Sequence, residues 1–188
     1  DPSYHGMVWT EFAKAVGPIA YIVRARFVGL RDIGAALSPQ SAFNIIQGLE
    51  TVSLRMEKHC SNAAKVAEYL SGHNKVSRVI YAGLDEGEAG ERANKYLKGG
   101  HGALCGIELK GGKASGEKFI NNLNMFYHVA NIGDARSLAI HPASTTHSQL
   151  SDEDMEAAGV NPSYVRLSIG IEHIDDIIED LKNALDAA

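Results

Sequence analysis

The chain has 188 residues, of which 45% are hydrophobic and 22% charged, so its composition is that of a globular protein rather than a disordered or fibrous one. Its net charge of -5 argues against nucleic-acid binding, because contacts with phosphates need a basic surface. No stretch approaches the roughly 20 apolar residues that span a bilayer, and we see no signal peptide or membrane partner. The two cysteines, Cys60 and Cys105, cannot form a disulfide framework, so we expect reduced thiols in a cytoplasmic protein.

The first part of the chain predicts helices. Residues 1–37 are expected to be irregular and then helical, since apolar residues recur at helical spacing. Ser38 and Pro39 begin the next helix as a hydroxyl cap followed by a proline in the first turn. The apolar pattern runs on to Leu70, and Gly72 supplies a stop. A helix of this length usually joins two bodies, so we predict one continuous linking helix.

After Gly72 strands and helices are mixed. We expect strands at 76–81, 102–109, 126–131, 137–141 and 164–171, and helices at 88–97, 114–125, 151–158 and 174–185. Some of the strands follow one another directly along the chain. The predicted fold is therefore of the α/β class, a small α+β layer with a mostly antiparallel sheet and helices on one side.

Few residues of this domain suggest chemistry by themselves. Arg166 lies on the polar side of the last strand, where a guanidinium can hold a carboxylate through two parallel hydrogen bonds, although such an arginine is more often exposed or structurally paired. Segments 131–138 and 141–147 are rich in small polar residues that can contact a ligand, and turns favour the same composition. His141 and His147 have no cysteine pair nearby, so we expect no metal site.

Six short stretches, taken in order, carry a resemblance to a known family. They are 37–39, 48–51, 54–60, 131–134, 141–147 and 165–172. Together they resemble the C-terminal half of the Cys/Met-metabolism pyridoxal-phosphate (PLP) enzymes, which include cystathionine synthases and lyases and methionine γ-lyase. Within that family, Asn131-Ile-Gly-Asp134 and the opening Asp1-Pro-Ser-Tyr-His-Gly6 are most similar to the O-acetylhomoserine sulfhydrylases.

The resemblance implies an organisation for the chain. Residues 1–37 would be the end of the large PLP domain, 38–72 the long linking helix, and 73–188 the C-terminal small domain of a fold-type-I PLP-dependent transferase. It also implies a homo-oligomer, a tetramer built as a dimer of dimers, with a small amino acid as substrate.

The resemblance also implies roles for three residues. Arg166 matches the arginine that binds the substrate α-carboxylate, Asn131 the loop position beside it, and Thr146 the hydroxyl residue that helps to hold the arginine. The implied reaction is γ-replacement, in which sulfide or a small thiol displaces acetate from O-acetylhomoserine to give homocysteine or methionine.

The cofactor lysine of the family is missing from these residues. It lies in a Ser-x-[Ser/Thr]-Lys-[Tyr/Phe] motif, which none of the lysines here occupies. The protein normally supplies this lysine and the partner of the pyridine nitrogen. We therefore expect no catalytic or cofactor-binding residue in this chain, and we expect the chain alone to be inactive.

Two alternatives stay open at this stage. The intact protein could instead be a cystathionine γ-synthase or γ-lyase or a methionine γ-lyase, which would share the fold and differ in the acceptor or in the outcome. The chain could also be a non-catalytic domain that serves only in subunit assembly.

Overall fold

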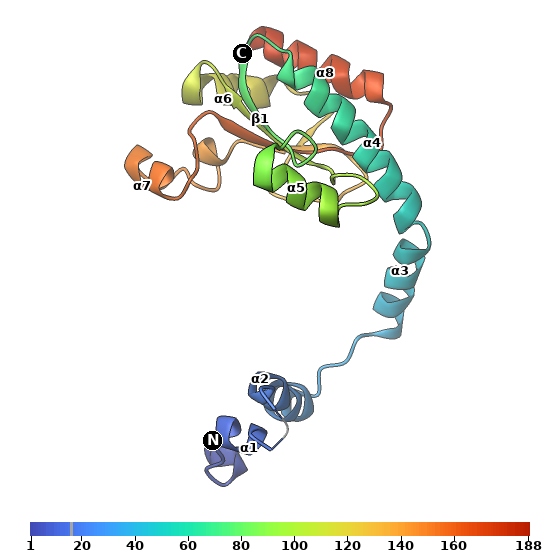
Figure 1. Ribbon diagram of the computed structural model, residues 1–188, viewed down its shortest axis with the longest axis vertical. Helices are drawn as coiled ribbons and strands as arrows, with labels where there is room; N and C mark the ends of the chain where they lie inside the picture. The colour runs from blue at the N-terminus through green and yellow to red at the C-terminus, as the bar shows by residue number, and fades with distance from the viewer. Residues whose placement is uncertain (16) are drawn as a thin grey trace. The chain divides into compact units, whose positions relative to one another are not determined.

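The computed structural model describes residues 1–15 and 17–188. They form two compact units, Asp1–Glu50 and Thr51–Ala188, which are described in turn (Figure 1).

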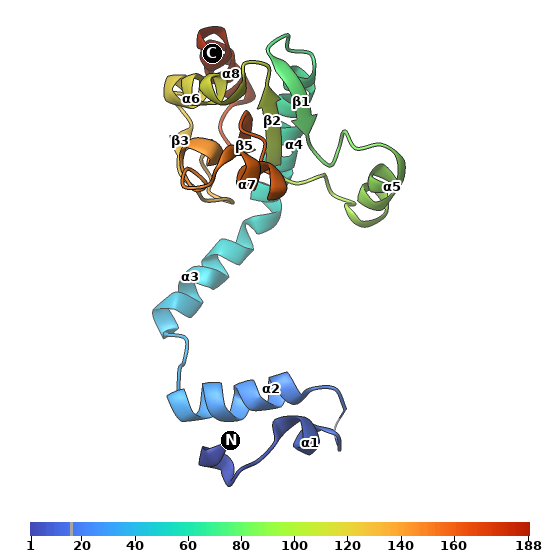
Figure 2. The same ribbon diagram turned by 90° about the vertical axis from the view of Figure 1, so that its left-hand side faces the viewer.

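The first unit is helical. Its elements are η1 (Pro2–Tyr4), α1 (Trp9–Ala13), α2 (Ala20–Arg24), the π-helical η2 (Ala25–Asp32) and α3 (Pro39–Glu50). Figure 2 shows α2 and η2 running past α1. The indole of Trp9 is buried here, with ring centroids 5.1 Å from Tyr4 and 6.1 Å from Phe27. The Tyr4 hydroxyl also donates to the Phe27 carbonyl at 2.9 Å, so an aromatic cluster holds this unit together.

The helix predicted over residues 39–70 is interrupted. It is two helices, α3 and α4 (Val52–Ser71), which part at Thr51. Thr51 has φ -112° and ψ 4°, outside helical geometry. Gly48 and the adjacent β-branched Thr51 and Val52 have low helix propensity, which explains a break at this place. The prediction of one unbroken helix is therefore wrong, and the assignment of residues 38–72 as an interdomain link stays a prediction.

The second unit is built on a five-stranded sheet. Its further elements are β1 (Val76–Ile80), α5 (Gly87–Tyr96), β2 (Leu104–Leu109), α6 (Gly112–Asn122), β3 (Tyr127–His128), β4 (Leu138–Ile140), η3 (Pro142–Ser144), α7 (Asp152–Ala157), β5 (Tyr164–Ser168) and α8 (Ile174–Ala187). The strand order is β1-β2-β5-β4-β3. Only the short β3 runs parallel to its neighbour, β4, among the paired strands of the described residues. The predicted mostly antiparallel α/β layer is confirmed, although β3 is much shorter than expected.

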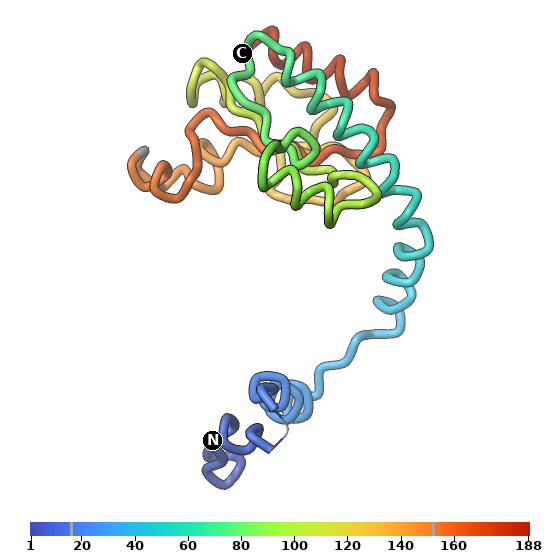
Figure 3. The backbone as a smooth tube through the Cα atoms, viewed as in Figure 1, coloured from blue at the N-terminus to red at the C-terminus, as the bar shows by residue number. Residues whose placement is uncertain are grey.

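The two faces of the sheet differ in chemistry. Ile107, Val165 and Leu167 point to one face and are fully buried. Helices α4, α6 and α8 pack there, and the backbone tube of Figure 3 shows α8 (red) alongside α4 (teal). The intervening residues Tyr164 and Arg166 lie on the other face and are only half-buried. Because side chains alternate along a strand, burial of one set fixes the other set on the open face. None of the described helices is both long and apolar enough to cross a lipid bilayer.

Asp180 joins α8 to the chain that leaves α6. Its carboxylate is 7% exposed and accepts the backbone N–H groups of Asn124 at 2.9 Å, Met125 at 3.0 Å and Phe126 at 3.3 Å. These residues lead into β3 and the loop beyond it. A single buried carboxylate thus satisfies three backbone donors and sets the path toward the open face.

We expect Asp180→Ala to lower the free energy of unfolding by about 3 kcal/mol, because three backbone donors lose a charged acceptor. Urea unfolding followed by circular dichroism measures this loss. Glu179→Ala removes an exposed carboxylate from the adjacent position of α8 and should change the unfolding free energy by less than about 0.5 kcal/mol. Equal effects of the two substitutions would contradict the assigned role of Asp180.

Candidate functional site

Strand β5 holds Arg166 at the centre of the open sheet face. Arg166 pairs with Gly106 of β2 on one side and with Ile140 of β4 on the other. The ring of Tyr164 lies over Gly106, where an added Cβ would come within 2.5 Å of the Tyr164 ring. Glycine at this position therefore leaves room for the aromatic ring. Burial raises the pKa of the Tyr164 hydroxyl, while the positive charge of Arg166 lowers it in part.

The guanidinium of Arg166 contacts the predicted loop. Its Nη2 donates to the backbone carbonyl of Asn131 at 3.2 Å. The side chain of Asn131 accepts the N–H of Ile132 at 2.9 Å, which fixes the local turn. Among the side chains that the structure describes, those of residues 1–15, 17–151 and 153–188, no carboxylate lies within ion-pairing distance of Arg166. A half-buried guanidinium with one carbonyl partner retains donors that can bind a ligand carboxylate.

A cavity of about 360 Å³ opens beside this arginine. Its lining includes Ile80, Tyr81, Asp85, His101, Tyr164 and Arg166. Cys105 also borders it, and burial raises the pKa of that thiol to about 12. The thiol is therefore protonated at neutral pH and is a poor nucleophile. The cavity combines apolar walls with three polar groups, the guanidinium of Arg166, the carboxylate of Asp85 and the imidazole of His101, so an acidic group of a small ligand would bind at the arginine.

The loop that carries Asn131 is bound to the strand that carries Arg166. The hydroxyl of Ser168, two residues beyond Arg166 and on the same face, accepts the N–H of Gly133 at 3.3 Å. Beyond β5, Glu172 accepts from both the N–H and the hydroxyl of Ser137, at 2.6 and 2.9 Å. The sequence reasoning gave Ser137, Ser168 and Glu172 no role. The period-two spacing of Ser168 from Arg166 is a signal that could have identified Ser168 as a residue of the same face.

Two side chains of α4 fix the chain at the end of β5. The imidazole Nδ1 of His59 bonds to the carbonyl of Ile169 at 2.6 Å. The amide of Asn62 donates to the carbonyls of Gly170 at 3.0 Å and Glu172 at 2.9 Å. Both side chains are buried. The backbone that presents Glu172 is thus attached to the helical layer.

The third predicted site residue, Thr146, is placed differently. Its hydroxyl pairs with Nδ1 of His147 at 2.9 Å, and in the described part of the chain it makes no hydrogen bond to Arg166. Thr146 follows η3 in the 141–147 segment and is exposed. The structure thus brings Arg166 and Asn131 into contact and leaves Thr146 outside that contact. The substrate-binding roles of all three stay a prediction.

The buried side chain of His141 anchors the 141–147 segment. Its Nε2 lies 2.8 Å from the carbonyl of Pro162, and its Nδ1 lies 2.8 Å from the hydroxyl of Ser144. A carbonyl can only accept, so Nε2 carries the proton and Nδ1 accepts from Ser144 when the ring is neutral. Burial lowers the pKa of His141, against an opposing effect of the bond to Pro162.

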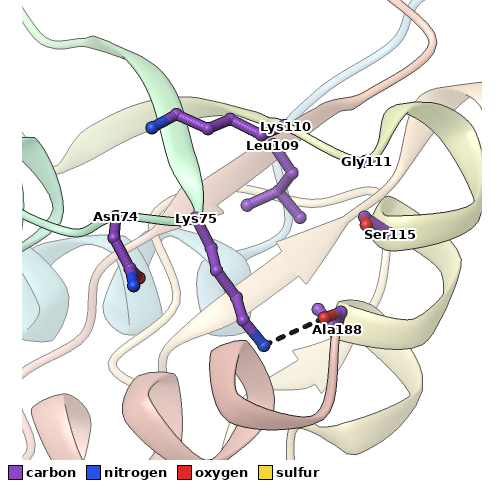
Figure 4. A pocket seen from close by; sticks show the side chains of 7 residues that line it. All are labelled: Asn74, Lys75, Leu109, Lys110, Gly111, Ser115 and Ala188. Atoms are coloured by element: carbon purple, nitrogen blue, oxygen red, sulfur yellow. Dashed lines mark hydrogen bonds between the residues drawn. The ribbon is translucent and has the colours of Figure 1, made fainter.

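The lysines of the chain differ in their exposure and contacts. All are exposed except Lys75, which is half-buried beside a cavity of about 250 Å³ (Figure 4). The Nζ of Lys75 donates to the carbonyls of Leu185, Asp186 and Ala188 at 2.8, 3.1 and 3.0 Å, and so caps the end of α8. A Schiff-base lysine needs a free amine in an enclosed site. Lys75 is therefore not free for this role, and the expectation that the cofactor lysine lies outside this chain stays a prediction.

The chain is similar to known proteins over nearly its whole length. The sequence model of the Cys/Met metabolism PLP-dependent enzymes matches residues 5–186. An O-acetyl-L-homoserine sulfhydrylase of Leptospira meyeri is 51% identical over 98% of the chain, and O-acetyl-L-homoserine sulfhydrylase 1 of Thermus thermophilus is 49% identical over 98%. A crystal structure of an O-acetylhomoserine (thiol)-lyase from Campylobacter jejuni, which contains a pyridoxyl-lysine-phosphate, is 42% identical over 99% of the chain, with a TM-score of 0.81.

The chain therefore belongs to the Cys/Met metabolism PLP-dependent enzyme family. It spans 43% of the length of each of these relatives. The family resemblance inferred from the six sequence stretches is confirmed.

The lowered pKa of His141 predicts a pH dependence of stability. Below its ordinary pKa of 6.5 the unfolded chain binds a proton that the folded chain does not, so stability is full above that pH and falls as the pH drops toward the lower folded pKa. We expect His141→Gln to lose less stability than the wild type between about pH 8 and about pH 5.5, measured as urea midpoints. His5→Asn, which replaces an exposed histidine at positive φ, is the control. An unchanged pH dependence in His141→Gln would refute the assignment.

Proposed function

We propose that the intact protein catalyses γ-replacement on O-acetylhomoserine. Sulfide or a small thiol would displace acetate and give homocysteine or methionine. Family membership supports PLP-dependent chemistry on sulfur amino acids, and the two relatives named above support the sulfhydrylase outcome. In this proposal the residues described here recognise the substrate and do not carry the cofactor.

The observation that carries the proposal is the guanidinium of Arg166, which has one carbonyl partner and no ion-pair partner among the side chains that the structure describes. It is half-buried on the open sheet face, is held by the Asn131 carbonyl at 3.2 Å, and borders a cavity of about 360 Å³. An amino-acid substrate offers an α-carboxylate, whose two oxygens match the planar donor fork of arginine. We therefore infer that Arg166 binds that carboxylate and that Asn131 and Thr146 border it.

Carboxylate binding at this position would orient the substrate. A carboxylate held by two parallel hydrogen bonds cannot rotate freely, so the α-carbon attached to it would take a fixed position above the sheet face. The chain's contribution to catalysis would thus be orientation.

We also propose the domain roles and the assembly. Residues 1–37 would complete the large domain, 38–72 would link the two domains, and 73–188 would be the small domain. Many large apolar side chains of the first unit are exposed, among them Tyr21 at 86% and Ile33 at 77%, and such surface favours burial in a larger assembly. A homotetramer in the cytoplasm fits this surface and the two free cysteines.

The rival activities are distinguished by the acceptor. When the full-length protein is given O-acetylhomoserine, we expect homocysteine with sulfide, no cystathionine with cysteine, and no rapid formation of a keto acid without an acceptor. Cystathionine as the main product would indicate a γ-synthase, and keto acid formation without an acceptor would indicate a lyase. Chromatography of the amino-acid products separates these outcomes.

We expect Arg166→Ala in the full-length protein to raise KM for O-acetylhomoserine about 10- to 100-fold. Each charge-assisted hydrogen bond contributes about 1.5–3 kcal/mol, and 1.4 kcal/mol is a tenfold change. Arg166→Lys keeps the charge and loses the planar fork, so its KM should be intermediate. Initial rates at varied substrate concentration measure both values.

Arg92→Ala is the matched control for these substitutions. Arg92 is exposed on α5 and forms an ion pair of 3.8 Å with Glu88 one turn away. Its loss should leave KM unchanged. If Arg166→Ala behaves like Arg92→Ala, the carboxylate clamp is disproved.

A further inference from the structure

We propose that Glu172 is a positioning residue for the carboxylate clamp. Through Ser137 it holds the loop of residues 129–137, so that the Asn131 carbonyl meets the guanidinium of Arg166. The part of this inference that concerns substrate rests on the proposed function. The part that concerns the loop rests on the contacts alone.

Both carboxylate oxygens of Glu172 bind one residue of the loop. Oε1 accepts the N–H of Ser137 at 2.6 Å, and Oε2 accepts its hydroxyl at 2.9 Å. The Ser137 hydroxyl in turn accepts the N–H of Gly170 at 2.9 Å. Ser137 is fully buried, so water cannot easily replace these partners. The end of the loop is therefore fixed by a closed hydrogen-bond network.

Gly170 allows the carboxylate to approach so closely. A Cβ at this position would overlap Oε2 of Glu172 and would lie 2.5 Å from the backbone nitrogen of Ser137 and 2.6 Å from the carbonyl of Ala135. Ala135 also accepts the N–H of Ile171 at 2.9 Å. The chain after β5 and the end of the loop thus lie against each other with no space for a side chain between them.

Asn131 depends on these attachments because it is exposed. On one side of it, the N–H of Val129 donates to the Ala139 carbonyl at 3.1 Å. On the other side, the N–H of Gly133 donates to the Ser168 hydroxyl at 3.3 Å. The latter bond is long, so the Ser137–Glu172 network is the stronger attachment on that side.

Glu172 acts on Arg166 through the loop and not by direct charge. The two side chains form no ion pair in the described part of the chain. Loss of the Glu172 carboxylate would free the loop end, move the Asn131 carbonyl away from Nη2, and leave the guanidinium without its fixed orientation. The expected result is weaker substrate binding with a smaller change in kcat.

The first test is amide hydrogen exchange in the full-length protein. Glu172→Ala should speed exchange in the peptide covering residues 129–137 by about tenfold or more, which corresponds to 1.4 kcal/mol. Glu172→Gln keeps an acceptor for the Ser137 N–H and should stay within about threefold of the wild type. Glu91→Ala, an exposed carboxylate on α5, is the control. Unchanged exchange in Glu172→Ala overturns the proposal.

The second test is a double-mutant cycle on KM for O-acetylhomoserine. Glu172→Ala should raise KM about tenfold when Arg166 is present and less than about twofold in the Arg166→Ala variant, because the free-energy effects of coupled residues are not additive. Equal effects in both backgrounds would show that Glu172 does not act through the arginine. If Arg166→Ala alone leaves KM unchanged, the proposed function fails, and hydrogen exchange still decides whether Glu172 positions the loop. Should Glu172→Ala not fold, Ser137→Ala removes the same bridging hydroxyl and is tested in its place.

Discussion

The attachment of the chain beyond β5 to α4 is the constraint on which the rest of the site depends. His59 and Asn62 reach from the helical layer and hold the carbonyls of Ile169, Gly170 and Glu172. These bonds are buried, where a lost partner is costly, so the backbone has one position. From that position the Glu172 side chain reaches the loop at Ser137, and the loop in turn reaches Arg166. The arginine is thus oriented by a chain of contacts that begins in the core.

The two faces of the sheet have separate tasks. The apolar residues of β2 and β5 pack against α4, α6 and α8, and this burial supplies the stability of the unit. The opposite face carries a guanidinium and a tyrosine beside a cavity, and it contributes little to the core. Side chains along β5 point alternately to the two faces. Burial of Val165 and Leu167 on one face therefore places Arg166, which lies between them, on the opposite face. A rigid scaffold therefore presents a polar group whose own interactions are incomplete.

Much of this could be predicted from the sequence, and the failures have physical causes. Alternation and amphipathic spacing predicted the strands, the helices and the open-face position of Arg166. The break at Thr51 was missed because apolar periodicity continues through it, while local backbone preference interrupts the helix. Glu172 and Ser137 lie 35 positions apart, and no local pattern reports that they meet. For Thr146 the motif match predicted a hydroxyl near Arg166. It could not predict that this hydroxyl pairs with the neighbouring imidazole of His147.

The close contact at Gly170 limits how this surface can diverge. Only hydrogen fits between that α-carbon and the Glu172–Ser137 pair, so every other amino acid encoded there disturbs the network that leads to the arginine. Ile80 and Leu104, which line the cavity beside Arg166, are exposed and meet no such restriction. Substitutions that keep the loop in place are thus excluded at Gly170 and accommodated on the β1–β2 side of the cavity.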